Sequence, residues 1–517
     1  MRPWAVLKRK KSWRKTMNEK VAIIGAGAYG LALGSYLAMN GFKVDIFEMH
    51  NAPGGVCTAW ARGGYTFDGC IHWLMGSGPS SSIYRLWEEL HAVQGRRFVE
   101  WDEYITVRLK SGERFTVYTD PARLEAEMLR IAPRDGTHIR ALCGAIRRLS
   151  RIDMPIAMET TSLSRKISMM SGLALFGPIM LRWGGVSVTA FCARLQSPVL
   201  AEALGTLYGG EGEMPDFPMT GLIMMLAYMH KKANGYPIGG SLAFARAIEK
   251  RFLELGGAVH YGTRIDRIVV KNDRAVGVAH GAEVHDADLV VSCADGHATI
   301  FDMLGGAYLS AEQREAYRSM PTFPSLLYVG LGIARNMSGE PTMKLFPLKE
   351  PMVLEEGALK VSTLSVRFFN FDPTTAPPGK TAAIVMISTR NHEYWTRLRR
   401  EDPACYKKQK ELVGERVVDA LEAEVGGIRE AVEVVDVSTP ATWIRYTGNW
   451  KGSYEGFLPT RKTMMKNLGF TLPGLDRFYM NGQWVSVGGG LPPAAMNGRA
   501  LAKRICKEFG RKFEALV

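Results

Sequence analysis

Three glycines near the start of the chain could bring a phosphate group against the backbone. They lie in Gly25-Ala26-Gly27-Ala28-Tyr29-Gly30, a G-x-G-x-x-G motif that directly follows the apolar run Val21 to Ile24. A buried strand that turns into a helix at such glycines points unpaired N–H groups at a pyrophosphate. Gly25 would allow the tight turn, Gly27 the close approach of the phosphate, and Gly30 the packing of the helix on the strand. The motif therefore predicts a dinucleotide site.

An acidic residue follows at the distance that such a site requires. A helix is predicted over Leu31 to Ala38, and a second strand over Lys43 to Glu48. A carboxylate at the end of that strand can accept hydrogen bonds from ribose hydroxyls. A lone glycine motif can be an accidental loop, but strand, helix, second strand and acid occur here in register. We expect Glu48 to bind the ribose, and Ala28 and Tyr29 to contact the pyrophosphate.

A second glycine pair indicates which dinucleotide binds. Gly54-Gly55 is followed by Phe67-Asp68 and by Ile71-His72-Trp73. These residues resemble the flavoprotein family of phytoene desaturases, carotenoid isomerases and retinol saturases, which are relatives of the amine oxidases. The resemblance implies FAD as the cofactor, with Gly54 and Gly55 continuing its contact beyond the pyrophosphate. The chain departs from the family at Val56, where a basic residue often follows the glycine pair.

The resemblance extends to the middle and the end of the chain. In the resembled family the backbone near Ile265 meets the adenine. Close to the C-terminus, the turn Asn481-Gly482-Gln483 precedes the run Gly488 to Pro493 and a helix predicted over Ala494 to Phe509. A helix N-terminus behind a glycine run can stabilise negative charge on a reduced flavin. The resemblance implies cofactor contacts from Gly482, Gln483, Gly490 and Leu491, with Gln483 in place of the usual acid.

These segments predict an α/β fold with a discontinuous Rossmann-type FAD-binding domain and an inserted α+β substrate domain. We expect the FAD-binding domain to comprise residues 21–95, 237–305 and 470–517. The substrate domain, which could face a membrane, would comprise residues 96–236 and 306–469. Residues 1–20 form a basic N-terminal tail.

The least polar part of the chain lies between residues 155 and 235. Ile167 to Leu181 carries no charge, and Leu222 to Met229 is a second apolar run. Both are shorter than the ~18 residues that indicate a transmembrane helix, so we predict none. Two interpretations remain, buried core helices or the lining of a tunnel for an elongated apolar ligand. The adaptable methionine side chains suit the tunnel; they are Met169, Met170, Met180, Met214, Met219, Met224, Met225 and Met229.

Charge and cysteine content limit the partners of the protein. The net charge is +14, and residues 1–20 hold eight Lys or Arg against one Glu. This tail could attract an anionic membrane surface, or it could be a solvated extension upstream of a natural start at Met17. No nucleic-acid-binding motif accompanies the charge, so nucleic acid is not expected as a partner. The sequence shows no pattern that indicates an oligomeric state.

The seven cysteines are scattered, and none forms a C-x-x-C pair. The sequence therefore predicts neither a metal site nor a thioredoxin-like redox pair. Reduced thiols favour a cytoplasmic location, with peripheral membrane contact left open. Cys57 and Cys70 fall close to the expected cofactor, where we expect them to pack as small apolar side chains.

His72 is the candidate catalytic residue. The sequence contains no Ser-His-Asp, paired-carboxylate or metal constellation of recognisable spacing. His72 follows the expected flavin loop between two apolar neighbours and could protonate a carbon opposite hydride delivery. The alternative is a core histidine bonded to a backbone carbonyl.

The resemblance implies desaturation, saturation or isomerisation of an apolar polyene or isoprenoid lipid. One alternative is an amine oxidase-like flavoenzyme with an aromatic cage, to which Trp443, Tyr446, Trp450 and Tyr454 could contribute. The other is a non-catalytic lipid-binding protein that holds FAD structurally.

Overall fold

The computed structural model describes residues 19–152, 176–208, 217–460, 463 and 466–517. The tail over residues 1–18, most of the apolar run that begins at Ile167, and Met214 lie outside these ranges.

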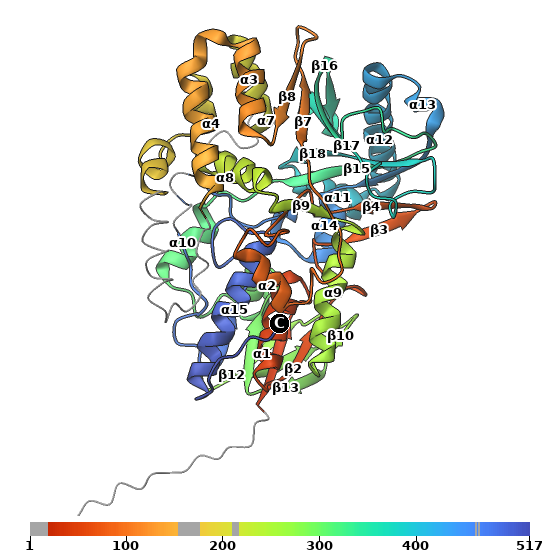
Figure 1. The fold of residues 1–517 in the computed structure, drawn as a ribbon. Coiled ribbons are helices and arrows are strands. Elements are labelled where there is room, and N and C mark those ends of the chain that lie inside the picture. Colours follow the sequence, from red (N-terminus) through yellow and green to blue (C-terminus); the bar gives the residue numbers. More distant parts are fainter. Residues whose placement is uncertain (1–18, 153–175, 209–216, 461–462, 464–465) are drawn as a thin grey trace, which may run out of the picture.

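A parallel five-stranded sheet forms one half of the molecule (Figure 1). Its order is β10-β2-β1-β14-β20, from Ala258–His260, Lys43–Phe47, Lys20–Ile24, Leu289–Ser292 and Phe478–Met480. Val21 pairs with Val44 on one side and with Leu289 on the other. Strands from the start, middle and end of the chain thus lie next to one another. The predicted Rossmann-type α/β fold is confirmed.

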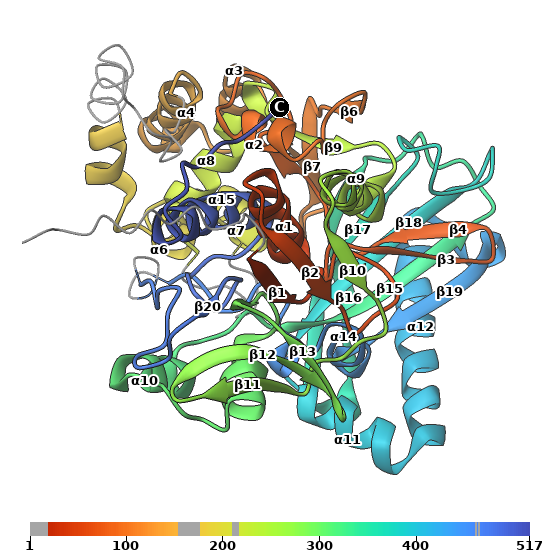
Figure 2. The ribbon, with the colours of Figure 1, turned by 90° about the horizontal axis from the view of Figure 1, so that it is seen from below.

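Both faces of this sheet are buried, as expected for parallel strands. Helices α1 (Ala28–Met39), α9 (Gly240–Glu254) and α15 (Leu491–Glu508) pack on one face against Val21, Ile23 and their neighbours. A three-stranded antiparallel sheet of β11 (Arg267–Lys271), β12 (Arg274–His280) and β13 (Glu283–Asp286) lies on the other face (Figure 2). The alternation of Ile23 and Ile24 between the two cores follows the period of two in a strand.

A seven-stranded mixed sheet forms the other half, in the order β19-β15-β18-β17-β16-β7-β8. Its strands are Val432–Ser438, Ser325–Ile333, Thr381–Thr389, Leu359–Phe368, Met343–Leu354, Glu103–Arg108 and Arg114–Tyr118. One face packs on α12 (Pro403–Val425) through Leu364, Val366 and their neighbours. Alternating residues from Phe98 to Tyr118 with a turn at Ser111-Gly112-Glu113 predict a hairpin in this region. The structure confirms it as β7 and β8.

Helices α3 (Pro121–Ile131), α4 (Gly136–Ser150), α7 (Pro198–Tyr208) and α8 (Met219–His230) form an apolar cluster next to the hairpin β7–β8. Asp120 caps α3 by accepting hydrogen bonds from the backbone of Ala122 and Arg123, and Pro121 occupies the first turn. A capping acid followed by proline at the first helical position is a sequence signal for a helix start, and α3 begins at this signal.

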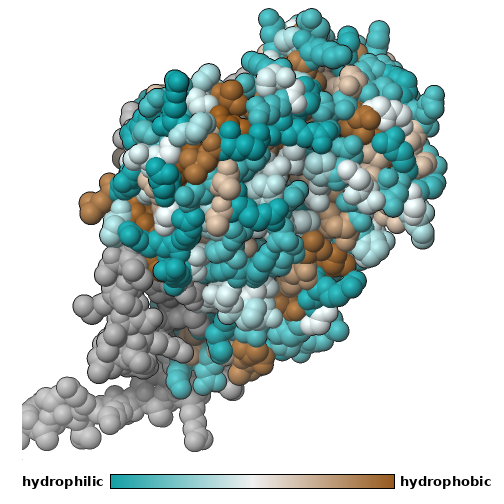
Figure 3. All heavy atoms as spheres, turned by 45° about the horizontal axis from the view of Figure 1, so that its top comes forward, coloured by the Kyte–Doolittle hydropathy of each residue, from teal (hydrophilic) through white to brown (hydrophobic). Residues whose placement is uncertain are grey.

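Further strands and helices lie outside the two large sheets and the helices named above. They are β3 (Ala59–Arg62), β4 (Tyr65–Asp68), β5 (Leu74–Met75), β6 (Phe98–Val99), β9 (Asn234–Pro237), α2 (Ile83–Glu89), α6 (Val188–Cys192), α10 (Ala311–Ser319), α11 (His392–Glu401), α13 (Ile428–Ala431) and α14 (Pro440–Thr447). Among the residues described, no helix combines the length and apolarity needed to cross a bilayer. The face in Figure 3 is mostly hydrophilic, with hydrophobic residues scattered over it.

Candidate active site

One cavity of about 1420 Å³ joins the two halves of the molecule. At one end it is lined by Ile24, Gly25 and Cys293, where β1 and β14 finish. At the other end it reaches Met343 and Met386 on the seven-stranded sheet. The carboxyl ends of parallel strands are where α/β sheets bind their ligands. The cavity therefore connects a nucleotide-type crevice directly to an apolar chamber.

The first glycine motif shapes the crevice as the sequence predicts. Gly25 has φ +97°, a conformation that favours glycine. A Cβ on Gly30 would lie 2.0 Å from the carbonyl oxygen of Gly25, so the helix start could not pack there with a larger residue. A Cβ on Gly27 would meet only the carbonyl oxygen of Gly54, at 3.9 Å, and would otherwise occupy the cavity. Gly27 thus leaves room for a ligand against the backbone.

The second glycine pair lies against the first motif. Gly54 and Gly55 have φ values of +106° and +62°, and a bridge pairs Gly54 with Gly27. The backbone N–H of Gly54 donates to the carbonyl of Ala26 at 2.9 Å. The two loops therefore form one wall of the crevice.

Glu48 organises the same loops through its carboxylate. Its two oxygens accept hydrogen bonds from the backbone N–H groups of Ala26, at 2.7 Å, and His50, at 2.8 Å. Burial raises the pKa of Glu48. Each carboxylate oxygen has further acceptor capacity, and Glu48 lines the cavity. The predicted ribose contact stays a prediction that this position favours.

Most of the predicted cofactor-binding residues line this one cavity. They are Gly25, Gly27, Ala28, Tyr29, Glu48, Gly54, Gly55, Ile265, Gln483, Gly490 and Leu491. Gly30 and Gly482 do not line it. Gly30 is covered by Gly25, and its role is in packing the helix. Gly482 lies in the connection between β20 and α15.

The residues present fit a dinucleotide of the FAD type. Neither α1 nor α15 has a side-chain cap at its N-terminus, and both helices begin at the cavity. Such N-termini leave backbone N–H groups to bind an anionic or carbonyl oxygen. Tyr29 and Trp484 also line the cavity, and the buried Tyr29 hydroxyl and Trp484 Nε1 have no hydrogen-bond partner among the described residues. A bound cofactor could satisfy these polar groups.

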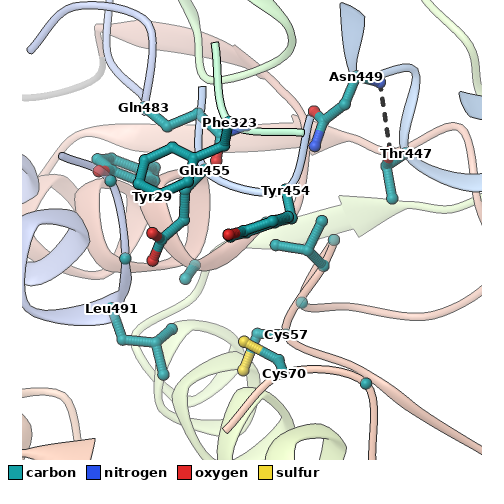
Figure 4. Close-up of a pocket in the computed structure, with 18 of the residues that line it drawn as sticks. Tyr29, Cys57, Cys70, Phe323, Thr447, Asn449, Tyr454, Glu455, Gln483 and Leu491 are labelled. Carbon is teal, nitrogen blue, oxygen red and sulfur yellow. Dashed lines mark hydrogen bonds between the residues drawn. The ribbon is translucent and has the colours of Figure 1, made fainter. Parts of the chain in front are cut away.

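Glu455 is a site residue that the sequence analysis missed. Figure 4 shows its carboxylate directed into the space between Tyr29, Tyr454 and Leu491. No hydrogen bond or ion pair connects it to a residue that the structure describes. Burial raises its pKa to about 7. A single glutamate in a loop carries no recognisable sequence pattern, so only the fold could bring it to notice.

His72 lines the chamber, as Arg367 does. Burial, and secondarily the charge of Arg367, lower the pKa of His72 to about 3. Its imidazole is therefore neutral near pH 7. A neutral imidazole can donate or accept a hydrogen bond but is a poor source of a proton.

Cys57 and Cys70 meet at the wall of the cavity, and Figure 4 shows their sulfur atoms side by side. The thiol of Cys57 donates to the carbonyl of Ser241 at 3.5 Å. A hydrogen bond to Cys57 and then burial raise the pKa of Cys70. The raised pKa keeps the Cys70 thiol protonated, in keeping with the expected packing role of this residue.

The chamber is apolar because alternate residues of its strands face it. Ile384, Met386 and Ser388 of β18 line the cavity, whereas Ala383, Val385 and Ile387 belong to the core on the other face. Helix α8 contributes Met224 and Met225 to the lining. These residues offer an elongated apolar surface rather than a compact polar pocket.

Of the four aromatic residues that could contribute to an amine oxidase-like cage, three line the cavity and one does not. Tyr446, Trp450 and Tyr454 line the cavity. Trp443 does not; its Nε1 donates to the carbonyl of Leu326 at 3.0 Å, and its ring packs on Trp60. Within the described ranges, no three His, Cys, Asp or Glu side chains come together as ligands for a metal ion.

Comparison with known proteins agrees with this geometry. The family model of an NAD(P)-binding Rossmann-like domain matches residues 23–90. Prolycopene isomerase of Daucus carota is 24% identical over 512 residues, which cover 94% of this chain and 80% of that protein. A 4,4'-diapophytoene desaturase of Methylomonas sp is 25% identical, with 96% and 97% covered. The chain is a homologue of carotenoid isomerases and desaturases.

Solved structures of other proteins share the fold of this chain over nearly its whole length. A putrescine oxidase variant superposes with a TM-score of 0.61 at 13% identity, covering 95% of this chain and 99% of that one. An oxidoreductase from Methanosarcina mazei gives 0.58 at 19% identity, with 94% and 100% covered.

Proposed function

We propose that the protein is an FAD-dependent oxidoreductase that acts on carbon–carbon double bonds of an apolar polyene or isoprenoid lipid, as a desaturase, saturase or isomerase. The observation that carries the proposal is the single cavity, which joins a dinucleotide crevice to a chamber lined by methionines and aliphatic side chains. The curated relatives named above support the substrate class.

When bound, FAD would supply two-electron transfer to or from the substrate. We propose that Gly27, Ala28 and Tyr29 bind the pyrophosphate, that Glu48 binds the ribose, and that Gly490 and Leu491 meet the ring. The discontinuous domain boundaries given above belong to this proposal. The residues of the chamber would hold the substrate chain and exclude water from the reacting carbons.

Proton handling is assigned to Glu455 in preference to His72. A carboxyl group with a pKa of about 7 can be both acid and base near neutral pH. His72, with its pKa of about 3, would instead orient the substrate through a hydrogen bond. Both residues line the same cavity as the predicted cofactor contacts.

An amine oxidase-like activity is the second candidate, favoured by Tyr446, Trp450 and Tyr454 in the lining. The buried cation Arg367 opposes it, because an ammonium substrate would be repelled in the same chamber. We therefore place the amine oxidase reaction second.

The test is the visible spectrum of the purified protein, followed by anaerobic reduction and addition of phytoene, lycopene or retinol. We expect a bound flavin whose reduced form is reoxidised by a polyene or whose oxidised form is reduced by one. Absence of flavin after reconstitution with FAD would refute the proposal. A flavin that no donor reduces would instead indicate a lipid-binding protein that holds FAD structurally.

An apolar substrate of this class resides in membranes. We propose a cytoplasmic protein that contacts the membrane surface peripherally, with the basic tail as one contributor.

A further inference from the structure

Arg367 is a buried cation without an anionic partner in the described part of the chain. The residue lies on β17 and is 5% exposed. It lines the same cavity as His72 and Ser365. Its Nε is buried and has no hydrogen-bond acceptor among the residues that the structure describes. Burial lowers the pKa of Arg367, but a guanidinium group remains charged at neutral pH.

Aromatic rings surround the guanidinium group without satisfying its donors. Its central carbon lies 5.3 to 5.5 Å from the ring centroids of four residues, Trp101, Tyr236, Phe369 and Phe371. Ring faces attract a cation, yet they supply no oxygen for planar N–H groups. Asp68 contributes to the electrostatics of Arg367, but its oxygens already accept bonds from Ser241 and Tyr236.

A buried charge without a counter-ion lowers the stability of the folded protein. Binding of an anionic ligand is a physical reason for the protein to retain such a charge. Guanidinium groups bind carboxylates through two parallel hydrogen bonds. The lining of the same cavity also includes apolar side chains, among them Met343 and Met225. The surroundings therefore combine one anion-binding group with a long apolar surface.

We propose that the chamber takes an elongated isoprenoid ligand that carries a carboxylate, and that Arg367 binds this carboxylate. The inference rests on the proposed function for the nature of the hydrocarbon chain and adds the acidic head group to it. A pure hydrocarbon would leave Arg367 as unpaired as it is without ligand.

The test compares two probes that share one skeleton, retinoic acid and retinol, by quenching of tryptophan fluorescence in the full chain with and without FAD. We expect the acid to bind at least about tenfold more tightly than the alcohol, since charge-assisted hydrogen bonds are stronger than those between neutral groups. In Arg367→Met this preference should vanish through loss of acid binding. Arg445→Met, which alters an exposed cation of the same lining, should retain it.

Stability supplies a second readout. Removing an unpaired buried charge should leave the urea midpoint of ligand-free Arg367→Met equal to or above that of the wild type. Arg367→Lys should fold and keep part of the acid preference, because it retains charge without the planar fork. Equal binding of acid and alcohol by the wild type, or an unchanged preference in Arg367→Met, would overturn the inference. The flavin spectrum of the same samples tests the proposed function separately.

Discussion

At the scale of single residues, the carboxylate of Glu455 differs from those of Glu48 and Asp295 in the same cavity because it has no hydrogen-bond donor among the described residues. Glu48 is held by two backbone N–H groups. Asp295 accepts bonds from the backbone of Trp450 and Ala298, at 2.8 Å each, and burial raises its pKa to about 6. Glu455 instead faces open cavity, with a pKa raised to about 7 by burial. It is thus free to exchange a proton with a ligand.

Replacing Glu455 by Gln should remove an ionisation near pH 7 from the pH profile of turnover and lower the rate at pH 7 by about 10²- to 10⁴-fold. The measurement is the rate of substrate-dependent flavin reduction or reoxidation between pH 5 and pH 9. Glu415→Gln, at an exposed position, is the matched control. An unchanged profile in Glu455→Gln would remove this residue from proton transfer.

The same substitution should change the pH dependence of stability. The pKa of Glu455 is raised in the folded protein to about 7 from an ordinary value of 4.5. The folded state therefore binds more protons between these values, and the wild type loses stability as pH rises from about 4.5 to about 7. We expect the wild type to fall relative to Glu455→Gln by on the order of 1–3 kcal/mol between pH 5 and pH 8. Urea unfolding of the flavin-free proteins at both pH values measures this difference.

At the scale of elements, Asp68 joins the end of β4 to the start of α9. Its carboxylate accepts hydrogen bonds from the backbone N–H of Ser241 at 2.8 Å, the hydroxyl of Tyr236 at 2.9 Å and the backbone N–H of Cys70 at 3.0 Å. The hydroxyl of Ser241 also donates to it. A negative charge at this position is further favoured by the N-terminus of α9. The bonds hold the wall that carries Cys70 and His72 against the helix.

Asp68→Asn should therefore destabilise the fold by about 2–4 kcal/mol, because an amide N–H₂ would face donors in a buried site. Equilibrium unfolding in urea is the measurement. Asp476→Asn removes a carboxylate that is 66% exposed and should stay within about 0.5 kcal/mol of the wild type. Equal midpoints for Asp68→Asn and the wild type would show that the buried bonds are not stabilising.

The secondary-structure elements also show how much of the fold local sequence patterns can predict. The β1-α1-β2 unit, the hairpin β7–β8 and the last helix follow from local periodicity and turn residues, and the structure has them within a few residues of the expected bounds. Glu455 and Arg367 could not be predicted. The role of each side chain depends on its tertiary surroundings. The aromatic cluster around Arg367, for example, consists of residues 101, 236, 369 and 371, which come from separate parts of the sequence. Local patterns do not report such long-range contacts.

At the scale of the whole molecule, one cavity is shared by both sheets, so a ligand in it contacts both halves at once. A ligand that binds only the folded state stabilises it by mass action. FAD at about 100 times its Kd should therefore stabilise the full chain by about 2.7 kcal/mol. Thermal unfolding with and without FAD measures the shift.

Gly27→Val provides the matching test of where FAD binds. Its side chain would project into the cavity with only the Gly54 carbonyl oxygen nearby, so the variant should fold yet show no shift with FAD. Gly339→Val, where a Cβ would meet nothing within 4 Å, should respond like the wild type. An equal FAD shift in Gly27→Val would place the cofactor elsewhere.

The strand order β10-β2-β1-β14-β20 also has a consequence for biosynthesis. β1 begins at Lys20, but its neighbour β14 begins at Leu289, and β20 begins only at Phe478. During translation, the N-terminal glycine motif emerges long before the strands that flank it. Strands that are far apart in the sequence pair slowly. Until they pair, the edges of the strands already synthesised remain exposed. The nascent chain should therefore depend on chaperones until its last forty or so residues leave the ribosome, and late addition of FAD should trap the completed sheet.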